Sequence, residues 1–158
     1  MSNIRVTYTG LISFAVAILS VILGIIFTLV LTRQFSIEEY GTWGLINGLL
    51  IYVTMIGPII SFWATREVSR GIESGKTAIL ASTLLSCGSS VIYILIAYFM
   101  SNQTQTDQNI LMFSTILIPA IFLYGILAAI NLGWKPHTIS YGTLAFASSQ
   151  VIFVMIFV

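Results

Sequence analysis

The chain has 158 residues, of which 58% are hydrophobic and 7% are charged, with a formal net charge of +1. Soluble domains carry about 25% charged residues, so this composition, with a mean hydropathy of +1.02, excludes a water-soluble globular domain and a disordered chain. The small net charge gives no attraction to nucleic acid, and the single Cys87 can form no internal disulfide. A membrane protein with several spans is the class that remains.

Five apolar segments without a charged residue are long enough to cross a bilayer. In chain order they cover residues 11–32, 43–63, 78–100, 110–132 and 139–158. About 20 apolar residues cross the hydrocarbon layer as a helix, and backbone groups in lipid must form their hydrogen bonds internally. We therefore predict an all-α, polytopic bundle of about five transmembrane helices, forming one membrane domain over residues 1–158.

The basic residues in the loops predict the orientation. One side of the membrane receives five of them, Arg5, Arg66, Arg70, Lys76 and Lys135, and the other side receives Arg33 alone. Because Lys and Arg are enriched in cytoplasmic loops, we expect a multi-pass protein of the cytoplasmic membrane with its N-terminus in the cytoplasm.

The first outer loop, LTRQFSIEEYGTWG over residues 31–44, contains two local signals. Ser36 and Glu39 form an S-x-x-E capping box, which predicts a helix start near Ile37. Gly44 and Gly48, with Gly41 before them, form a small-residue face on which another helix could pack closely.

This loop, followed by GPIISFWATREVSRG over residues 57–71, resembles the N-terminal part of the polysaccharide-export flippases of the multidrug/oligosaccharidyl-lipid/polysaccharide superfamily. The positions that match the family pattern of a basic, an acidic, an aromatic and a glycine residue are Arg33, Glu39, Tyr40 and Gly41. The resemblance implies part of one lobe of a two-lobed transporter that moves lipid-linked oligosaccharide or polysaccharide precursors, such as those of O-antigen, to the outer leaflet. Its partners would be this substrate and the membrane lipids.

The last segment is still apolar at Val158, so we expect a fragment. Because alternating access needs two halves that rock about one site, we expect this chain to be inactive alone. Two alternatives stay open. One is a fragment of a cation-coupled multidrug exporter, and the other is a small five-helix scaffold that binds partners through its Gly and Ser faces.

An anionic lipid headgroup would need cationic side chains along its path, but none of the five apolar segments contains a Lys or Arg residue. The nearest are Arg33 and Arg66, which serve either as phosphate ligands or as anchors that snorkel to the interface. Pro58 and Pro119 are expected to kink their helices. The kinks serve either as bending points of a transporter or as structural bends that packing against neighbouring helices stabilises.

Other polar residues have a structural and a functional interpretation. Ser82, Ser86, Ser89 and Ser90 share one helix face and favour helix packing over a substrate lining, as do Asn47 and Asn131. Asn102 begins a glycosylation sequon whose use stays open. The chain has no nucleophile, base and acid set, and His137 lacks partners at metal-ligand spacing, so we expect neither an enzyme nor a bound cofactor or metal.

Overall fold

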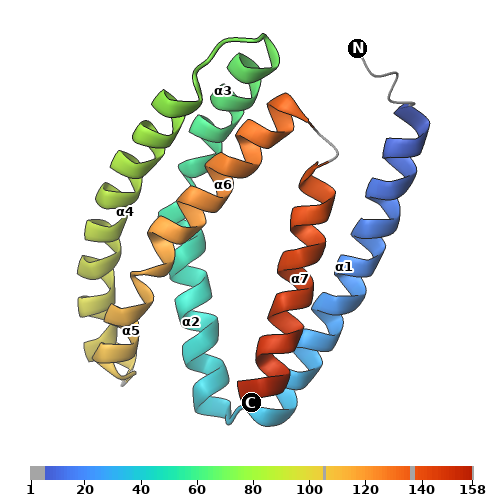
Figure 1. Ribbon diagram of the computed structural model, residues 1–158. Coiled ribbons are helices and arrows are strands. Elements are labelled where there is room, and N and C mark those ends of the chain that lie inside the picture. The colour runs from blue at the N-terminus through green and yellow to red at the C-terminus, as the bar shows by residue number, and fades with distance from the viewer. Residues whose placement is uncertain (1–5, 105, 136–137, 158) are drawn as a thin grey trace. The chain divides into compact units, whose positions relative to one another are not determined.

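The computed structural model describes residues 6–104, 106–135 and 138–157, and this part of the chain is helical without a strand (Figure 1). The helices are α1 (Val6–Gln34), α2 (Ile37–Thr54), α3 (Gly57–Ser69), α4 (Gly75–Thr104), α5 (Gln108–Ser114), α6 (Leu117–Trp134) and α7 (Thr138–Phe157). The predicted all-α class is confirmed. Arg5, His137 and Val158 lie outside the described residues.

Four stretches of helix are long and apolar enough to cross a membrane on their own. They are Ser13–Gln34, Gly75–Thr104, Gln108–Trp134 and Ile139–Ile156. The pair α2 and α3 passes the same test jointly and is bent by 52°. With that pair counted as one span, these five spans overlap the five predicted segments. The fold is therefore a helical membrane bundle.

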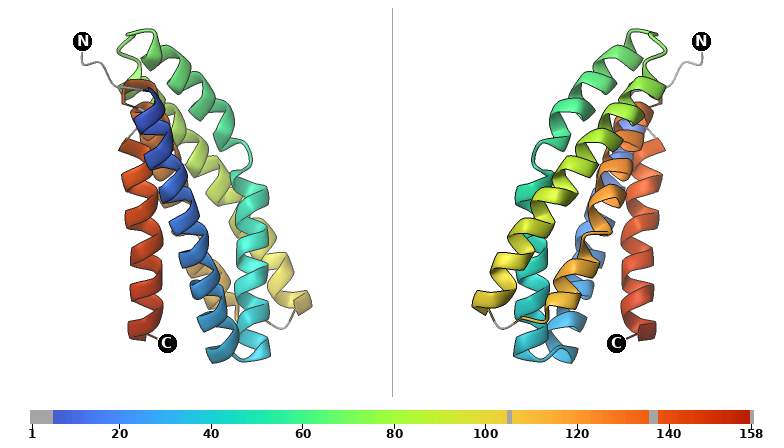
Figure 2. Two further views of the ribbon diagram at one scale, coloured as in Figure 1. Left: turned by 90° about the vertical axis from the view of Figure 1, so that its right-hand side faces the viewer. Right: turned by 90° about the vertical axis from the view of Figure 1, so that its left-hand side faces the viewer.

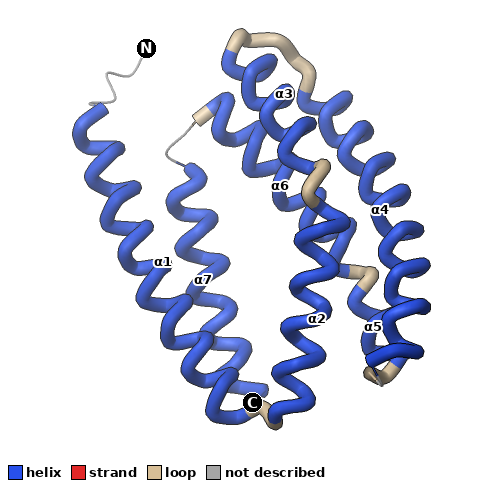
Figure 3. The backbone as a smooth tube through the Cα atoms, turned by 180° about the vertical axis from the view of Figure 1, so that it is seen from behind, coloured by secondary structure: helices blue, strands red, loops and turns tan. Residues whose placement is uncertain are grey.

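Two of the spans are broken, at Met55–Ile56 and at Thr115–Ile116, where loop interrupts the helices in Figure 3. Proline has no N–H, and its ring clashes with the carbonyl four residues earlier. Pro58 follows the first break by two residues, and Pro119 follows the second by three. The N–H groups of Ile59 and Ile118 instead bond three residues back, at 3.2 and 3.1 Å. The predicted kinks are therefore breaks between separate helices.

The chain divides into two compact units, Met1–Tyr40 with Lys135–Val158, and Gly41–Trp134. In the first, α1 and α7 lie side by side although they are far apart in the sequence (Figure 2). The Ser13 and Ser140 hydroxyls join them with a hydrogen bond of 2.9 Å.

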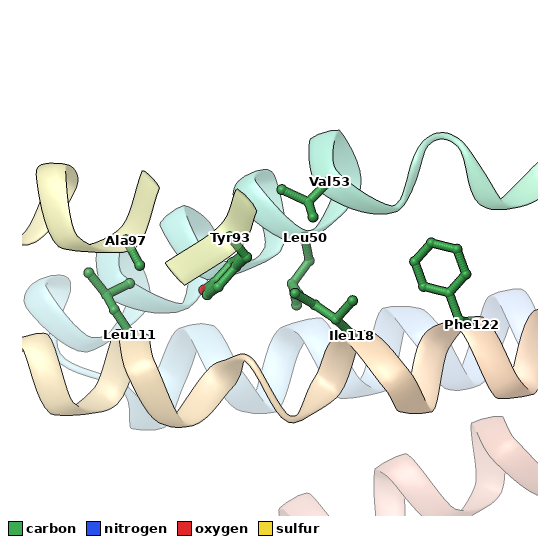
Figure 4. Close-up of a cluster of buried hydrophobic side chains, with 7 residues drawn as sticks. All are labelled: Leu50, Val53, Tyr93, Ala97, Leu111, Ile118 and Phe122. Atoms are coloured by element: carbon green, nitrogen blue, oxygen red, sulfur yellow. The ribbon is translucent and has the colours of Figure 1, made fainter. Parts of the chain in front are cut away.

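The second unit has a core along α4 and both broken spans. Its buried members, drawn in Figure 4, are Leu50, Val53, Tyr93, Ala97, Leu111, Ile118 and Phe122. The Tyr93 ring is fully buried, and its hydroxyl lies 2.5 Å from the Ser114 hydroxyl, directly before the second break. Since Ser114 in turn donates to the Leu111 carbonyl at 2.7 Å, Tyr93 is the donor of this pair.

Serines of α4 join the helices of this unit. The Ser82 hydroxyl donates to the Phe122 carbonyl of α6, and the Ser89 hydroxyl donates to the Val53 carbonyl of α2, both at 3.2 Å. Ser86 and Ser90 donate within α4 itself. The packing interpretation of the serine face is confirmed for Ser82 and Ser89.

Ser89→Ala is expected to lower the free energy of unfolding by about 0.6 kcal/mol, the average for hydrogen bonds between membrane helices. The Val53 carbonyl lies at the break and would lose its side-chain donor. Ser90→Ala is the matched control, because Ser90 bonds only inside α4. Reversible unfolding in detergent, followed by circular dichroism, measures both. Equal decreases of the unfolding free energy in the two variants would contradict the role of Ser89 in joining α4 to α2.

Helices α3 and α6 approach most closely along a row of small residues. A Cβ added to Gly133 would lie 2.8 Å from the Thr65 carbonyl oxygen and 2.9 Å from the Val68 Cβ. One turn earlier, the Thr65 hydroxyl donates to the Ala129 carbonyl at 3.0 Å. Another turn earlier, a Cβ on Gly125 would meet the Ser61 hydroxyl at 3.8 Å. The contacts advance in the same direction along both helices, so α3 and α6 run parallel.

The small-residue face predicted at Gly44 and Gly48 is not the site of this close approach. A Cβ added to either glycine, or to Gly41, meets no atom within 4 Å. The tight helix contact of this unit uses Gly125, Ala129 and Gly133 instead.

Candidate functional site

The outer-loop motif is held together by the predicted capping box. The backbone N–H of Ser36 donates to the Glu39 carboxylate at 2.8 Å, and the Glu39 N–H donates to the Ser36 hydroxyl at 3.2 Å. Both bonds satisfy amides that would otherwise lack partners at the helix start. Helix α2 begins at Ile37 as predicted, so Glu39 has a structural role here.

The other motif residues do not converge on a site. Arg33 lies in the last turn of α1, and its side chain is exposed. Tyr40 and Gly41, near the start of α2, are exposed as well. In the described part of the chain, neither Arg33 nor Glu39 forms an ion pair. The motif therefore shapes the entry into the first broken span and gathers no charged site within these residues.

Because of the capping box, the contribution of Glu39 to the stability of the fold depends on pH. Glu39 precedes Trp43, where the predicted span begins, so its carboxyl lies outside the membrane-spanning segment. Hydrogen bonds from the Ser36 backbone and side chain hold the pKa of the Glu39 carboxyl below its usual range. A depressed pKa in the folded state stabilises the fold at neutral pH, and this contribution is lost as the pH falls through that pKa.

Glu39→Gln is therefore expected to be less stable than the parent chain at neutral pH, with a difference that shrinks on acidification. Unfolding in detergent at a series of pH values measures this difference. Glu73→Gln, at an exposed position before α4, is the control. A Glu39→Gln difference that does not vary with pH would contradict the capping role of the carboxylate.

A cavity of about 530 Å³ lies beside the break between α2 and α3. Its lining comes from these two helices, α4 and α6, and consists of Thr54, Gly57, Pro58, Ser61, Phe62, Ser82, Ile121, Phe122, Tyr124 and Gly125. Ligand sites of small molecules have volumes of about 300–1,000 Å³. The break opens this space because Pro58 bends α3 away from the line of α2, and because Gly57 and Gly125 carry no side chain to fill it.

The cavity is neutral and mostly apolar. Its lining carries four hydroxyls, those of Thr54, Ser61, Ser82 and Tyr124. Thr54 donates to the Leu50 carbonyl at 2.7 Å, and Ser82 donates to the Phe122 carbonyl at 3.2 Å. The Ser61 hydroxyl forms no hydrogen bond to the described residues. The arrangement suits a hydrocarbon group, with Ser61 able to bond one neutral polar atom.

Arg66 is the cation nearest to this cavity along α3. Pro58, Phe62 and Arg66 follow one another at intervals of four residues, so they form one stripe on the helix surface, and all three are exposed. Arg66 forms no ion pair among the described residues, whereas Arg70 lies 3.6 Å from Glu67.

Asn47 and Asn131 lie inside apolar segments, which predicts that both amides are buried, but the two residues differ. The Asn47 amide is half-buried and donates to the Trp43 carbonyl of its own helix at 2.9 Å. Asn131 lies on the exposed side of α6, so the prediction of burial was wrong for it. No cluster of three His, Cys, Asp or Glu side chains that could hold a metal occurs within residues 6–104, 106–135 and 138–157.

Comparison with known proteins finds no matching family model, curated protein or solved structure. The functional interpretation therefore depends on the residues themselves and on the resemblance in the outer loop.

The sequence interpretation missed the cavity. Pro58 and Ser82 were singled out for a kink and for helix packing, while Gly125 and Phe122 were not singled out at all. The repeat of small residues at Gly125, Ala129 and Gly133 is a signal that could have located the contact of α6 with α3, and with it one wall of the cavity.

Proposed function

We propose that this chain belongs to the N-terminal half of a transporter that moves lipid-linked oligosaccharides across the cytoplasmic membrane for surface polysaccharide synthesis. One observation carries the proposal. A broken span starts at the outer-loop motif of Arg33, Glu39, Tyr40 and Gly41 and opens a neutral cavity at its break. Broken helices beside a cavity are typical of substrate sites in transporters.

The chemistry of the cavity agrees with such a substrate. A lipid-linked oligosaccharide carries a long hydrocarbon chain, and the cavity is lined by aromatic rings, aliphatic groups and four hydroxyls. The loop charges support a cytoplasmic N-terminus, since the alternation of the five predicted spans assigns Arg66, Arg70, Lys76 and Lys135 to one side of the membrane and Arg33 to the other. In this orientation the cavity faces the cytoplasmic half of the bilayer.

Deleting the coding region in its source cell tests the proposal. We expect loss of surface polysaccharide and its return when the full reading frame is restored. The benign Ser90→Ala variant should also restore it, and Gly133→Val, which disrupts the contact between α3 and α6, should not. Unchanged surface polysaccharide in the deletion strain would overturn the proposal.

A second candidate function is a membrane scaffold that binds another helix on the face of Gly41, Gly44 and Gly48. The open space at these three glycines favours it, because a G-x-x-x-G face normally receives a closely packed helix. Substituting leucine at Gly44 separates the two functions. A scaffold would lose its partner in a pull-down from solubilised membranes, whereas a transporter would keep its substrate-dependent phenotype.

A further inference from the structure

Two helix breaks in the second unit precede one tightly packed pair of helices. The first break, at Met55–Ile56, lies directly before α3, and the second, at Thr115–Ile116, lies directly before α6 (Figure 3). Beyond the breaks, Gly133 of α6 is in close contact with α3, and the Thr65 hydroxyl bonds the Ala129 carbonyl. The α3–α6 pair is therefore one body, joined to α2 through one break and to α5 through the other.

Each break has the backbone of a hinge. Pro58 and Pro119 supply no N–H for a bond to the residue four positions earlier, and the N–H groups of Ile59 and Ile118 bond three residues back. Hinges are a few residues at the ends of elements that absorb a change of backbone angles. The first break is bent by 52°, so straightening is the movement that it leaves available.

Helix α4 is bonded to the parts of the chain that come before the breaks. The Ser89 hydroxyl donates to the Val53 carbonyl of α2 at 3.2 Å, and the Tyr93 hydroxyl bonds the Ser114 hydroxyl of α5. Val53 and Ser114 each lie within two residues of a break. These bonds hold α2 and α5 on α4, so the three helices form the stationary side of both breaks.

The contact of α4 with the α3–α6 pair is made of small side chains. Ala78 of α4 is buried in one cluster with Ala64 of α3 and Ala129 of α6. Sliding of packed helices is a common form of movement, and methyl groups oppose it less than long side chains do. The bond from the Ser82 hydroxyl to the Phe122 carbonyl crosses this contact at 3.2 Å, and a swing of the pair would break it.

The cavity lies between these two bodies at the first break. Thr54 of α2 and Ser82 of α4 line it on one side, and residues of α3 and α6 line it on the other. The Phe122 ring points toward the loop between α2 and α3 in Figure 4, and a Cβ added to Gly57 would lie 3.4 Å from this ring. Since the bend at Pro58 opens this space, straightening would narrow it.

We propose that α3 and α6 swing as one body about the two breaks, and that straightening of the first break narrows the cavity. Because the pair is joined to both breaks, the swing cannot occur at one break alone. A change that straightens the second break must therefore act on the first, although the two lie in different spans. This gate acts on the cavity of the proposed function but does not rest on the identity of its occupant.

Distances between spin labels in the full chain, reconstituted in phosphatidylcholine vesicles, test this movement. Cysteines replace exposed residues in a Cys87→Ala background. Labels at Ile51 and Ser69 span the first break, and labels at Ile59 and Leu132 report on the α3–α6 pair. Pulsed electron paramagnetic resonance is expected to give two distances for the first set, the longer one from the straightened span, and one distance for the second set.

A variant at the second break separates a coupled swing from a local kink. Pro119→Ala lets α5 continue into α6, and we expect it to raise the ratio of the longer to the shorter distance across the first break about fivefold, at the low end of couplings between sites. Ser82→Ala, which removes the bond that the swing breaks, should raise this ratio about threefold. Ser90→Ala, which loses a bond inside α4, should leave it unchanged.

The cavity has a separate readout. A cysteine in place of Ser61 lies in the lining, and its reaction with N-ethylmaleimide is expected to be about fivefold slower with Pro119→Ala. A cysteine in place of Ser69, at the exposed end of α3, should react at the same rate with and without Pro119→Ala. If Pro119→Ala loses helicity in detergent, Pro58→Ala replaces it and is read across the second break, with labels at Ile110 and Leu132.

A single distance across the first break in the parent chain would overturn the proposal. So would a proline variant that leaves the other break unchanged, or a distance between Ile59 and Leu132 that changes with the swing. These outcomes are separate from those of the proposed function. A deletion strain that keeps its surface polysaccharide would reject the transport function and leave the hinge in place, whereas loss of polysaccharide with a rigid first break would do the reverse.

Discussion

Gly133→Ala is expected to lower the free energy of unfolding by about 1–3 kcal/mol, the usual range for overpacking a tight core. The added Cβ would lie 2.8 Å from the Thr65 carbonyl oxygen, so backbone would have to move. Helices α3 and α6 would separate, and the Thr65 bond to the Ala129 carbonyl would lengthen. Gly133→Val should be more destabilising still. Reversible unfolding in mild detergent measures both.

Gly44→Ala is the matched control. It makes the same change inside a helix of the same unit, but the new Cβ meets no atom within 4 Å. Alanine stabilises a helix interior relative to glycine by about 0.5–1 kcal/mol, so this variant should be neutral or slightly more stable. If Gly44→Ala lowered the unfolding free energy as much as Gly133→Ala does, the assignment of the tight contact to α3 and α6 would be contradicted.

Tyr93→Ala is expected to lower the free energy of unfolding by about 2–4 kcal/mol, through the cavity left by a ring that is 0% exposed. Lipid is as apolar as the core, so lost packing contacts, and not transfer to water, cause most of this loss. Tyr93→Phe keeps the ring and removes only the bond to Ser114, which costs about 1 kcal/mol. The same unfolding measurement separates the two contributions.

Tyr98 of the same helix provides the comparison for these variants. Its side chain is 52% exposed and packs edge to face with Phe99. Tyr98→Phe should leave stability unchanged, and Tyr98→Ala should cost much less than Tyr93→Ala. Similar losses at positions 93 and 98 would show that Tyr93 is not the centre of this core.

Local features of the fold followed from the sequence because their partners are close together in the chain. The capping box needs only Ser36 and Glu39, and it placed the start of α2 at Ile37. The breaks follow from single prolines, since Pro58 and Pro119 act on carbonyls one turn earlier. The five spans follow from the length of uncharged sequence that a bilayer requires.

Contacts between distant segments could not be predicted in this way. Two sets of small residues share the same spacing of four positions. The first set is Gly44 and Gly48, and the second is Gly125, Ala129 and Gly133. Only the second set is packed against a helix of the same unit. The bond between Ser13 and Ser140 joins residues 127 positions apart. The cavity likewise needs side chains from α2, α3, α4 and α6, so no single stretch of sequence indicates it.

The sequence singled out charged residues for the candidate site, whereas the cavity found in the structure is lined by neutral ones. Arg33 and Arg66 were singled out as the cations closest to the spans, and both are exposed at helix ends. Only Arg66 shares a helix stripe with residues that line a cavity.

The most direct measurement of the transport function is the leaflet location of the lipid-linked saccharide. Cells with and without the restored reading frame are treated with a membrane-impermeant reagent that modifies exposed sugars. We expect the deletion strain to accumulate lipid-linked saccharide that the reagent cannot reach, and restoration to make it reachable. An unchanged amount of lipid-linked saccharide, equally reachable in both strains, would contradict the proposed function.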